Sequence, residues 1–261
     1  MVLAAALPGL AAAVTGWTAV GSDRARPLDE SQGLATIVRP SGATICYTGV
    51  ATVDPGQAAQ GRNRVGDPGA AQGWYVESYR RDDRGAKLFR VQAPDGTQTD
   101  YRLALEPGEA SNNSFAAVSP DARRLVAGEW GTMNRLLVHP MPDAAFTDPA
   151  QNLPYASAIR LDHQVRDVQG CDFLTATRLM CASDDPDGSL FGTTKPLLQI
   201  DLDGPLSGSD VTGHVTSLGR LPLQSRELRG RGECDSTLRV IVMSPGACIA
   251  FDGKTWRYQQ R

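Results

Sequence analysis

The 261-residue chain has few aromatic residues, few histidines and almost no helical periodicity, and each shortage excludes a class of structure or site. Aromatic residues make up 6% of the chain, so a core must be built mainly from aliphatic side chains. His139, His163 and His214 are the only histidines, so a Ser/His/Asp triad would have to use one of these three. No CxxC pair, HExxH helix or GxSxG elbow is present, which argues against zinc sites and α/β-hydrolases.

Charge of one sign is also lacking, since 26 basic and 29 acidic residues are well mixed and give a net charge of −3. No basic stripe indicates a nucleic-acid partner. No polybasic or amphipathic stretch indicates a membrane surface. We therefore expect the partner to be a small molecule, a glycan or a protein, and expect no nucleic acid.

What the chain does contain is a series of short apolar runs separated by turns. Hydrophobic residues make up 41%, and the 27 glycines and 17 prolines suit many tight turns. The clearest stretch is FAAVSPDARRLVAGEWGTMNRLLV at 115–138, which predicts strands at 115–118, 125–127 and 136–138. Three antiparallel strands with a Pro-Asp turn make most of one propeller blade.

Two later segments, 178–181 and 238–241, resemble 124–127, because each follows a turn and precedes another predicted strand. The leucines of these segments, Leu125, Leu179 and Leu238, are 54 and 59 residues apart. That spacing exceeds the roughly 40–45 residues of a regular WD40 blade. We predict an all-β fold, a β-propeller of about five degenerate blades of roughly 40–50 residues each, with a two-sheet β-sandwich as the alternative.

The turn Ser119-Pro120-Asp121, followed by the apolar run 124–127, resembles the SPDG turn of β-propellers with seven-residue motifs. A broader resemblance, in 112–130 and 166–185, is to secreted bacterial propeller proteins of unassigned function. The resemblance implies a propeller fold and export, and implies no activity. Ala122 stands where such turns usually have glycine, so we expect that the turn needs no positive φ there.

The first 20 residues carry no charge and are rich in alanine, which is typical of a secretory signal peptide. Small residues such as Ala19 and Gly21 lie where a cut would fall, although no Lys or Arg precedes the apolar run. A membrane anchor and a local core segment are the alternatives. We expect a signal peptide at 1–21, a linker at 22–35, a propeller domain at 36–261, a secreted or cell-envelope location, and no stable membrane insertion after processing.

The five cysteines fit export. Cys171 and Cys181 flank a predicted hairpin that brings them opposite each other, within reach of a disulfide. Cys234 and Cys248 bracket a second hairpin, and Cys46 is left over. Buried thiols and, less readily, metal ligation are the alternative roles.

Polar residues beside the clearest blade are the first candidates for a ligand site. Glu129 and Trp130 place a carboxylate beside an aromatic platform, which suits sugar stacking or acid–base chemistry. Asn112 and Asn113 offer amide groups to a ligand. A packed tryptophan with a solvated glutamate, and a local Asx turn, explain the same residues without a ligand.

The segment 162–187 supplies the remaining candidates. Asp167 and His163, together with Glu129, are weak catalytic candidates, and Asp172 is a further ligand-binding candidate. Asp184, Asp185 and Asp187 are weak candidates for binding calcium, although Asp-Pro-Asp-Gly is also an ordinary turn. We otherwise expect no cofactor.

Two functions fit these observations. The first is an exported propeller that serves as a binding or interaction module. The alternative is a secreted propeller hydrolase or lyase, with or without a metal ion, that uses carboxylates on the channel face. The alternative requires Glu129, Asp167 and either Asp184 or Asp185 to converge on one pocket.

Overall fold

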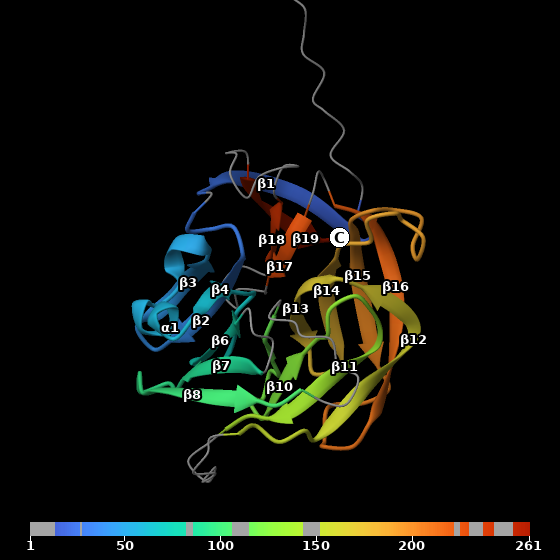
Figure 1. Ribbon diagram of the computed structural model, residues 1–261. Coiled ribbons are helices and arrows are strands. Elements are labelled where there is room, and N and C mark those ends of the chain that lie inside the picture. The colour runs from blue at the N-terminus through green and yellow to red at the C-terminus, as the bar shows by residue number, and fades with distance from the viewer. Residues whose placement is uncertain are drawn as a thin grey trace, which may run out of the picture.

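The structure is a computed structural model, and it is all-β apart from one short helix and one 3₁₀ turn in its described part. It describes residues 14–26, 28–81, 86–105, 115–142, 152–221, 225–229, 237–242 and 253–261. In Figure 1 the sheets follow one another in chain order around a common centre, from blue on the left through green below to orange on the right. This propeller-like arrangement agrees with the predicted fold class.

Most strands belong to antiparallel units that are consecutive in the chain. The first unit is the hairpin β2 (Gly33–Arg39) and β3 (Gly42–Thr48). The second contains β4 (Arg62–Val65), β5 (Gly69–Ala71), β6 (Trp74–Arg81), β7 (Lys87–Gln92) and β8 (Gln98–Leu103). The third contains β9 (Ala117–Val118), β10 (Arg124–Ala127), β11 (Thr132–Pro140) and β12 (Ser157–Arg166). The fourth contains β13 (Val168–Thr175), β14 (Arg178–Ser183), β15 (Pro196–Leu202) and β16 (Val211–Arg220).

The last unit joins the two ends of the described chain. Its strands are β17 (Ser225–Arg229), β18 (Thr237–Val242), β19 (Gly253–Gln260) and β1 (Trp17–Ala25), in that order across the sheet. β1 pairs with β19 in antiparallel register from Trp17↔Gln260 to Ala25↔Gly253. The N-terminal strand therefore pairs with the C-terminal strand and becomes the outermost strand of this sheet.

One strand near the start of each unit contributes to an inner ring. β5 contacts β2 and β9, β9 contacts β13, β13 contacts β17, and β17 contacts β2. On the outside, β12 and β16 pair in parallel over Ile159↔Val211 to Leu161↔Gly213, which joins two units into one eight-stranded sheet. This arrangement places the strand ends of several units around one centre, where a ligand site can form.

The segment 115–138 folds as predicted into β9, β10 and β11. The related segments begin β14 and lie in β18, so all three are second strands of their units. One expectation was wrong, because Ala122 has a φ of +54°. The turn takes the left-handed conformation without glycine: Ala122 N–H donates to Ser119 O at 2.7 Å, and Ser119 N–H donates to Arg124 O at 2.9 Å.

The Gly- and Ala-rich segment 54–72 contains regular structure. Asp54 accepts a hydrogen bond from Gln57 N–H and caps α1 (Pro55–Ala59), which follows the 3₁₀ turn η1 (Val50–Thr52). β4 and β5 both pair with β6, although neither strand has the alternating apolar and polar residues that predict a strand. Gly69 is needed for close packing, because a Cβ there would lie 2.2 Å from Ala116 O of the next unit.

β1 crosses the boundary between the predicted signal peptide and the predicted linker. Trp17 is 5% exposed and Ala25 is fully buried, so both ends of the strand are packed. A cut between Ala19 and Gly21 would divide this strand. None of the helices in the described part of the chain has the length and apolar character needed to cross a bilayer.

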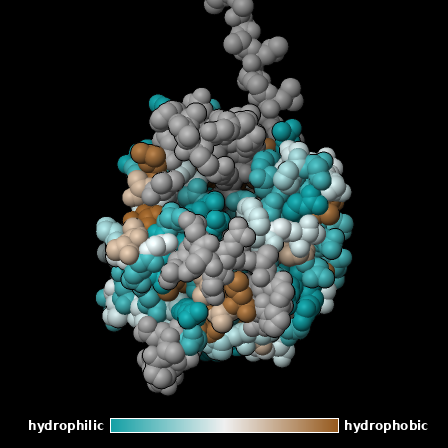
Figure 2. All heavy atoms as spheres, in the orientation of Figure 1, coloured by the Kyte–Doolittle hydropathy of each residue, from teal (hydrophilic) through white to brown (hydrophobic). Residues whose placement is uncertain are grey.

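The predicted disulfide between Cys171 and Cys181 is confirmed, and it joins directly paired residues of β13 and β14. Cys46 is a free, half-buried thiol, as expected. Cys234 and Cys248 lie outside the described residues. The surface shown in Figure 2 is mainly hydrophilic, and its apolar areas are small and separate.

Candidate functional site

Candidate side chains lie in two places in the ring, at opposite ends of the strands. One, the loop end, comprises the connections β10–β11, β12–β13 and β14–β15, at 128–131, 167 and 184–195. The other is a pocket where β2, β5, β9 and β13 finish. Most of the predicted residues lie at the loop end.

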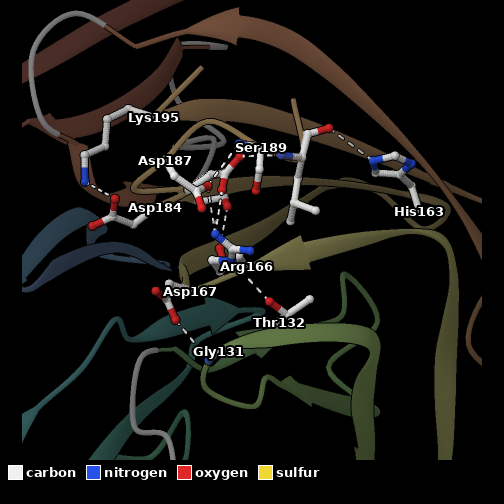
Figure 3. Close-up of polar contacts among 12 residues, drawn as sticks. Gly131, Thr132, His163, Arg166, Asp167, Asp184, Asp187, Ser189 and Lys195 are labelled. Atoms are coloured by element: carbon white, nitrogen blue, oxygen red, sulfur yellow. Dashed lines mark hydrogen bonds and ion pairs between the residues drawn. The ribbon is translucent and has the colours of Figure 1, made fainter. Parts of the chain in front are cut away.

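Asp167 lies at the loop end and points towards Gly131 (Figure 3). Its Oδ1 accepts a hydrogen bond from Gly131 N–H at 2.9 Å, and its own N–H donates to Gly131 O at 3.1 Å. Burial raises the pKa of the Asp167 carboxyl, partly offset by the Gly131 N–H, while the nearby Asp184 carboxylate raises it further. Its φ of +42° is unusual for a residue other than glycine. The two-way contact with Gly131 fixes Asp167 between neighbouring units.

Arg166 neutralises two of the predicted calcium ligands. Its Nη1 lies 3.3 Å from Asp185 Oδ1 and 2.9 Å from Asp187 Oδ1. Asp185 is fully buried, and its Oδ2 accepts a hydrogen bond from Leu190 N–H at 2.9 Å. Hydrogen bonds from Ser189, assisted by Arg166, hold the pKa of Asp187 well below its usual range. These contacts organise the β14–β15 loop.

Asp184, the third predicted calcium ligand, forms an ion pair with Lys195, which is 8% exposed. Each carboxylate of the Asp-Asp-Pro-Asp segment thus faces a cation of the protein. Within the described residues, no group of three or more His, Cys, Asp or Glu side chains is arranged to hold a metal ion. The calcium site stays a prediction to which the geometry adds no support.

Glu129 and Trp130 lie at the same end, in the β10–β11 connection. Glu129 is 8% exposed and makes a two-pronged contact with Arg135, with distances of 2.9 Å and 3.1 Å between guanidinium nitrogens and carboxylate oxygens. Trp130 is 44% exposed. Because Gly131 follows Trp130 directly and binds Asp167, Glu129 and Asp167 lie at the same end of the strands. Their convergence on one pocket, which the enzymatic alternative requires, stays a prediction.

His163 does not join these carboxylates. Its Nε2 lies 3.3 Å from Leu190 O, and its ring packs against Phe191 with 4.9 Å between centroids. Its sequence neighbour Asp162 instead contacts His214 Nδ1 at 2.9 Å. Successive side chains of β12 point to opposite faces, which separates Asp162 from His163. The predicted ligand residues Asn112 and Asn113 lie outside the described residues.

Asp172 lies in the middle of β13, and it lines the pocket rather than the loop end. Five residues of extended strand separate it from Asp167, or roughly 16 Å, so the two do not share a site. Asp172 Oδ1 accepts a hydrogen bond from Phe173 N–H at 2.7 Å. Burial raises the pKa of the Asp172 carboxyl to about 7, against the lowering effect of that hydrogen bond. No described cation pairs with this carboxyl.

The pocket beside Asp172 has a volume of about 240 Å³. Its walls come from four inner strands and the turns that follow them. The lining residues are Thr36, Val38, Ala70, Ala71, Gln72, Val118, Pro120, Asp172, Phe173 and Leu174. We call this cavity the Asp172 pocket.

Two polar residues of the Asp172 pocket were not predicted. Thr36 has a buried Oγ1 with no hydrogen-bond partner within the described structure. Gln72 has a φ of +48°, and its side-chain amide donates to Pro120 O at 2.8 Å. Neither residue stands in a recognisable motif, and only the closing of the ring brings them near Asp172.

Comparison with known proteins finds similarity among solved structures alone. No family model matches the chain, and no curated protein matches it. A gluconolactonase from Xanthomonas campestris has a solved structure that aligns with a TM-score of 0.41 and 12% identity. The alignment covers 77% of this chain, and this chain spans 58% of the gluconolactonase chain.

Proposed function

We propose that this protein is an exported five-bladed propeller that binds a small polyhydroxylated ligand, such as a terminal sugar residue, in the Asp172 pocket. The five blades are the five consecutive units, and β1 supplies the outermost strand of the last one. The cycle of contacts among β2, β5, β9, β13 and β17 supports this count. The Cys171–Cys181 disulfide is compatible with an oxidising compartment.

The observation that carries the binding proposal is the Asp172 carboxyl itself. A half-buried carboxyl with a raised pKa and no cationic partner among the described residues is costly to the fold, and such groups cluster at functional sites. Here the carboxyl lines a cavity that a ligand can enter, rather than a packed core. A ligand that donates hydrogen bonds to Asp172 would remove that cost.

The rest of the Asp172 pocket fits a sugar better than an apolar molecule. Asp172 accepts hydrogen bonds, the unpartnered Thr36 Oγ1 can donate or accept, and Gln72 adds an amide. Phe173 and Val118 supply apolar surface for the C–H face of a sugar ring. A volume of about 240 Å³ suits one sugar ring rather than a long chain.

A panel of monosaccharides tested by isothermal titration calorimetry and ligand-observed NMR examines this proposal. The wild-type protein should bind at least one sugar, and Asp172→Asn should weaken that binding at least tenfold because the amide cannot replace a charged acceptor. Asp95→Asn, an exposed carboxylate away from the pocket, is the matched control and should leave sugar binding unchanged. Equal affinities of wild type and Asp172→Asn would refute the proposal.

Our second proposal is a secreted hydrolase or lyase at the loop end. It is supported by the alignment of Glu129, Asp167 and Asp184 on one face and by the raised pKa of Asp167, which suits proton transfer. Turnover of small esters, lactones or glycosides should then be lost in Asp167→Asn and kept in Asp172→Asn. The reverse pattern, or no turnover, would contradict this second proposal.

A further inference from the structure

A second cleft, independent of the Asp172 pocket, opens on the β6–β7–β8 sheet. Its volume is about 460 Å³, within the usual range of roughly 300–1,000 Å³ for small-molecule sites. Trp74, Pro94, Tyr101 and Pro142 give it apolar walls, and Asp95 and Thr97 lie among its lining residues. We call it the Trp74 cleft.

The sheet register explains how these residues meet. Val91 pairs with Thr99, and Phe89 pairs with Tyr101, so alternate residues of β7 and β8 share one face. Gly73 precedes Trp74 with a φ of +82°, and a Cβ at this glycine would lie 3.2 Å from Pro94 Cβ. The glycine therefore lets the chain before β6 pass close to the β7–β8 turn.

The β7–β8 turn also holds the carboxylate of this cleft. Ala93 N–H donates to Thr97 O at 2.8 Å, and Gly96 N–H donates to Ala93 O at 2.9 Å. Asp95 Oδ1 accepts a hydrogen bond from Thr97 N–H at 2.9 Å, and the two hydrogen bonds from Thr97 lower the pKa of Asp95. Asp95 therefore stays ionised at neutral pH and keeps a fixed place on an exposed turn.

The chemistry of the walls selects the ligand class. Aromatic and proline rings favour a flat apolar ring, and stacked aromatic pairs gain stability beyond the area they bury. A polyol would leave several hydroxyl groups unpaired against such walls, which costs free energy. The single fixed anion at Asp95 favours a cationic group on the same ligand.

From these contacts we infer that the Trp74 cleft binds a small aromatic amine, with its ring against Trp74 and its ammonium group at Asp95. The site does not depend on the proposed sugar site, because the two cavities share no lining residue. The partner is thus a single-ring or double-ring aromatic molecule bearing one positive charge.

Three matched probes test this inference: tryptamine, 3-ethylindole and indole-3-propionate, which carry a positive, a zero and a negative charge on the same ring. Titrations followed by two-dimensional NMR of the full chain should shift the Trp74 indole N–H and the Gly96 and Thr97 amides. Tryptamine should bind about 2- to 5-fold more tightly than 3-ethylindole, the effect of one exposed ion pair. Indole-3-propionate should bind more weakly than either.

Asp95→Asn tests the electrostatic part without disturbing the turn, because asparagine also forms an Asx turn. The variant should bind all three probes with similar affinity. Trp74→Phe keeps an aromatic core residue and should weaken all three probes together. Shifts confined to residues outside the cleft, or an unchanged preference for tryptamine in Asp95→Asn, would overturn the inference.

Discussion

The half-buried Asp172 carboxyl should make the fold less stable as the pH rises. Its pKa is about 7 in the folded protein and roughly 3.9 in an unfolded chain. The folded state therefore binds more protons between these values, and its stabilising contribution is complete below pH 4 and is lost as the pH rises through 7. Three pH units correspond to about 4 kcal/mol, and partial solvent contact reduces the expected effect to about 2–4 kcal/mol.

Asp172→Asn removes this titration while keeping an oxygen that can accept the Phe173 N–H. In guanidinium unfolding, the stability of the variant relative to wild type should increase as the pH rises from 4 to 8. The difference in unfolding free energy between the two proteins should change by about 2–4 kcal/mol across the range. Other titrating groups are common to both proteins and cancel in this difference.

Asp95→Asn is the control for the same experiment. Hydrogen bonds from Thr97 lower the pKa of Asp95, so its contribution to stability is present above the unfolded pKa and is lost as the pH falls. The pH dependence of this variant should have the opposite sign and be small. A difference between wild type and Asp172→Asn that varies by less than about 0.5 kcal/mol from pH 4 to pH 8 would refute our account of the pocket.

Three further predictions concern the fold. Burial lowers the pKa of His139 to about 4, so the free energy of unfolding should fall by about 3 kcal/mol from pH 6.5 to below pH 4. Acid unfolding of His139→Gln should show a smaller loss, and an equal loss in the two proteins would contradict this prediction. Replacing Cys171 and Cys181 by serine should cost about 2–3 kcal/mol in chemical unfolding, given the separation of 10 residues, and an unchanged midpoint would count against the disulfide. N-terminal sequencing of exported protein should place the cut before Val14, because β1 begins at Trp17; a stable mature protein that begins at Gly21 would disprove closure by this strand.

The sequence predicted the antiparallel units best where apolar runs alternate with strong turn residues. The segment 115–138 and the hairpin at 171–181 are of this kind, and both folded as expected. β4 and β5 were missed because their stability comes from pairing with β6 rather than from local pattern. Ala122 shows the same limit, because tertiary packing holds it in a conformation that glycine usually takes.

The candidate sites were predictable only in part. The acidic residues at 167–187 were visible in the sequence, but their cations were not, because Arg166 and Lys195 gain their roles from loop geometry. Asp172 was one of several candidate aspartates in the sequence. That it lies in a different site from Asp167 follows from its position along β13 and from its surroundings in the pocket. Thr36 and Gln72 come from other units, more than 90 residues away in the chain, and no spacing rule connects them to Asp172.

The most direct test of the central claim is a crystal structure or NMR contact map of the protein with the tightest-binding sugar. We expect a sugar hydroxyl within hydrogen-bond distance of the Asp172 carboxyl, with Thr36 and Gln72 as neighbours, and we expect Asp172→Asn to lose the complex. A sugar bound elsewhere on the protein, with the Asp172 pocket unchanged, would contradict the proposed binding site.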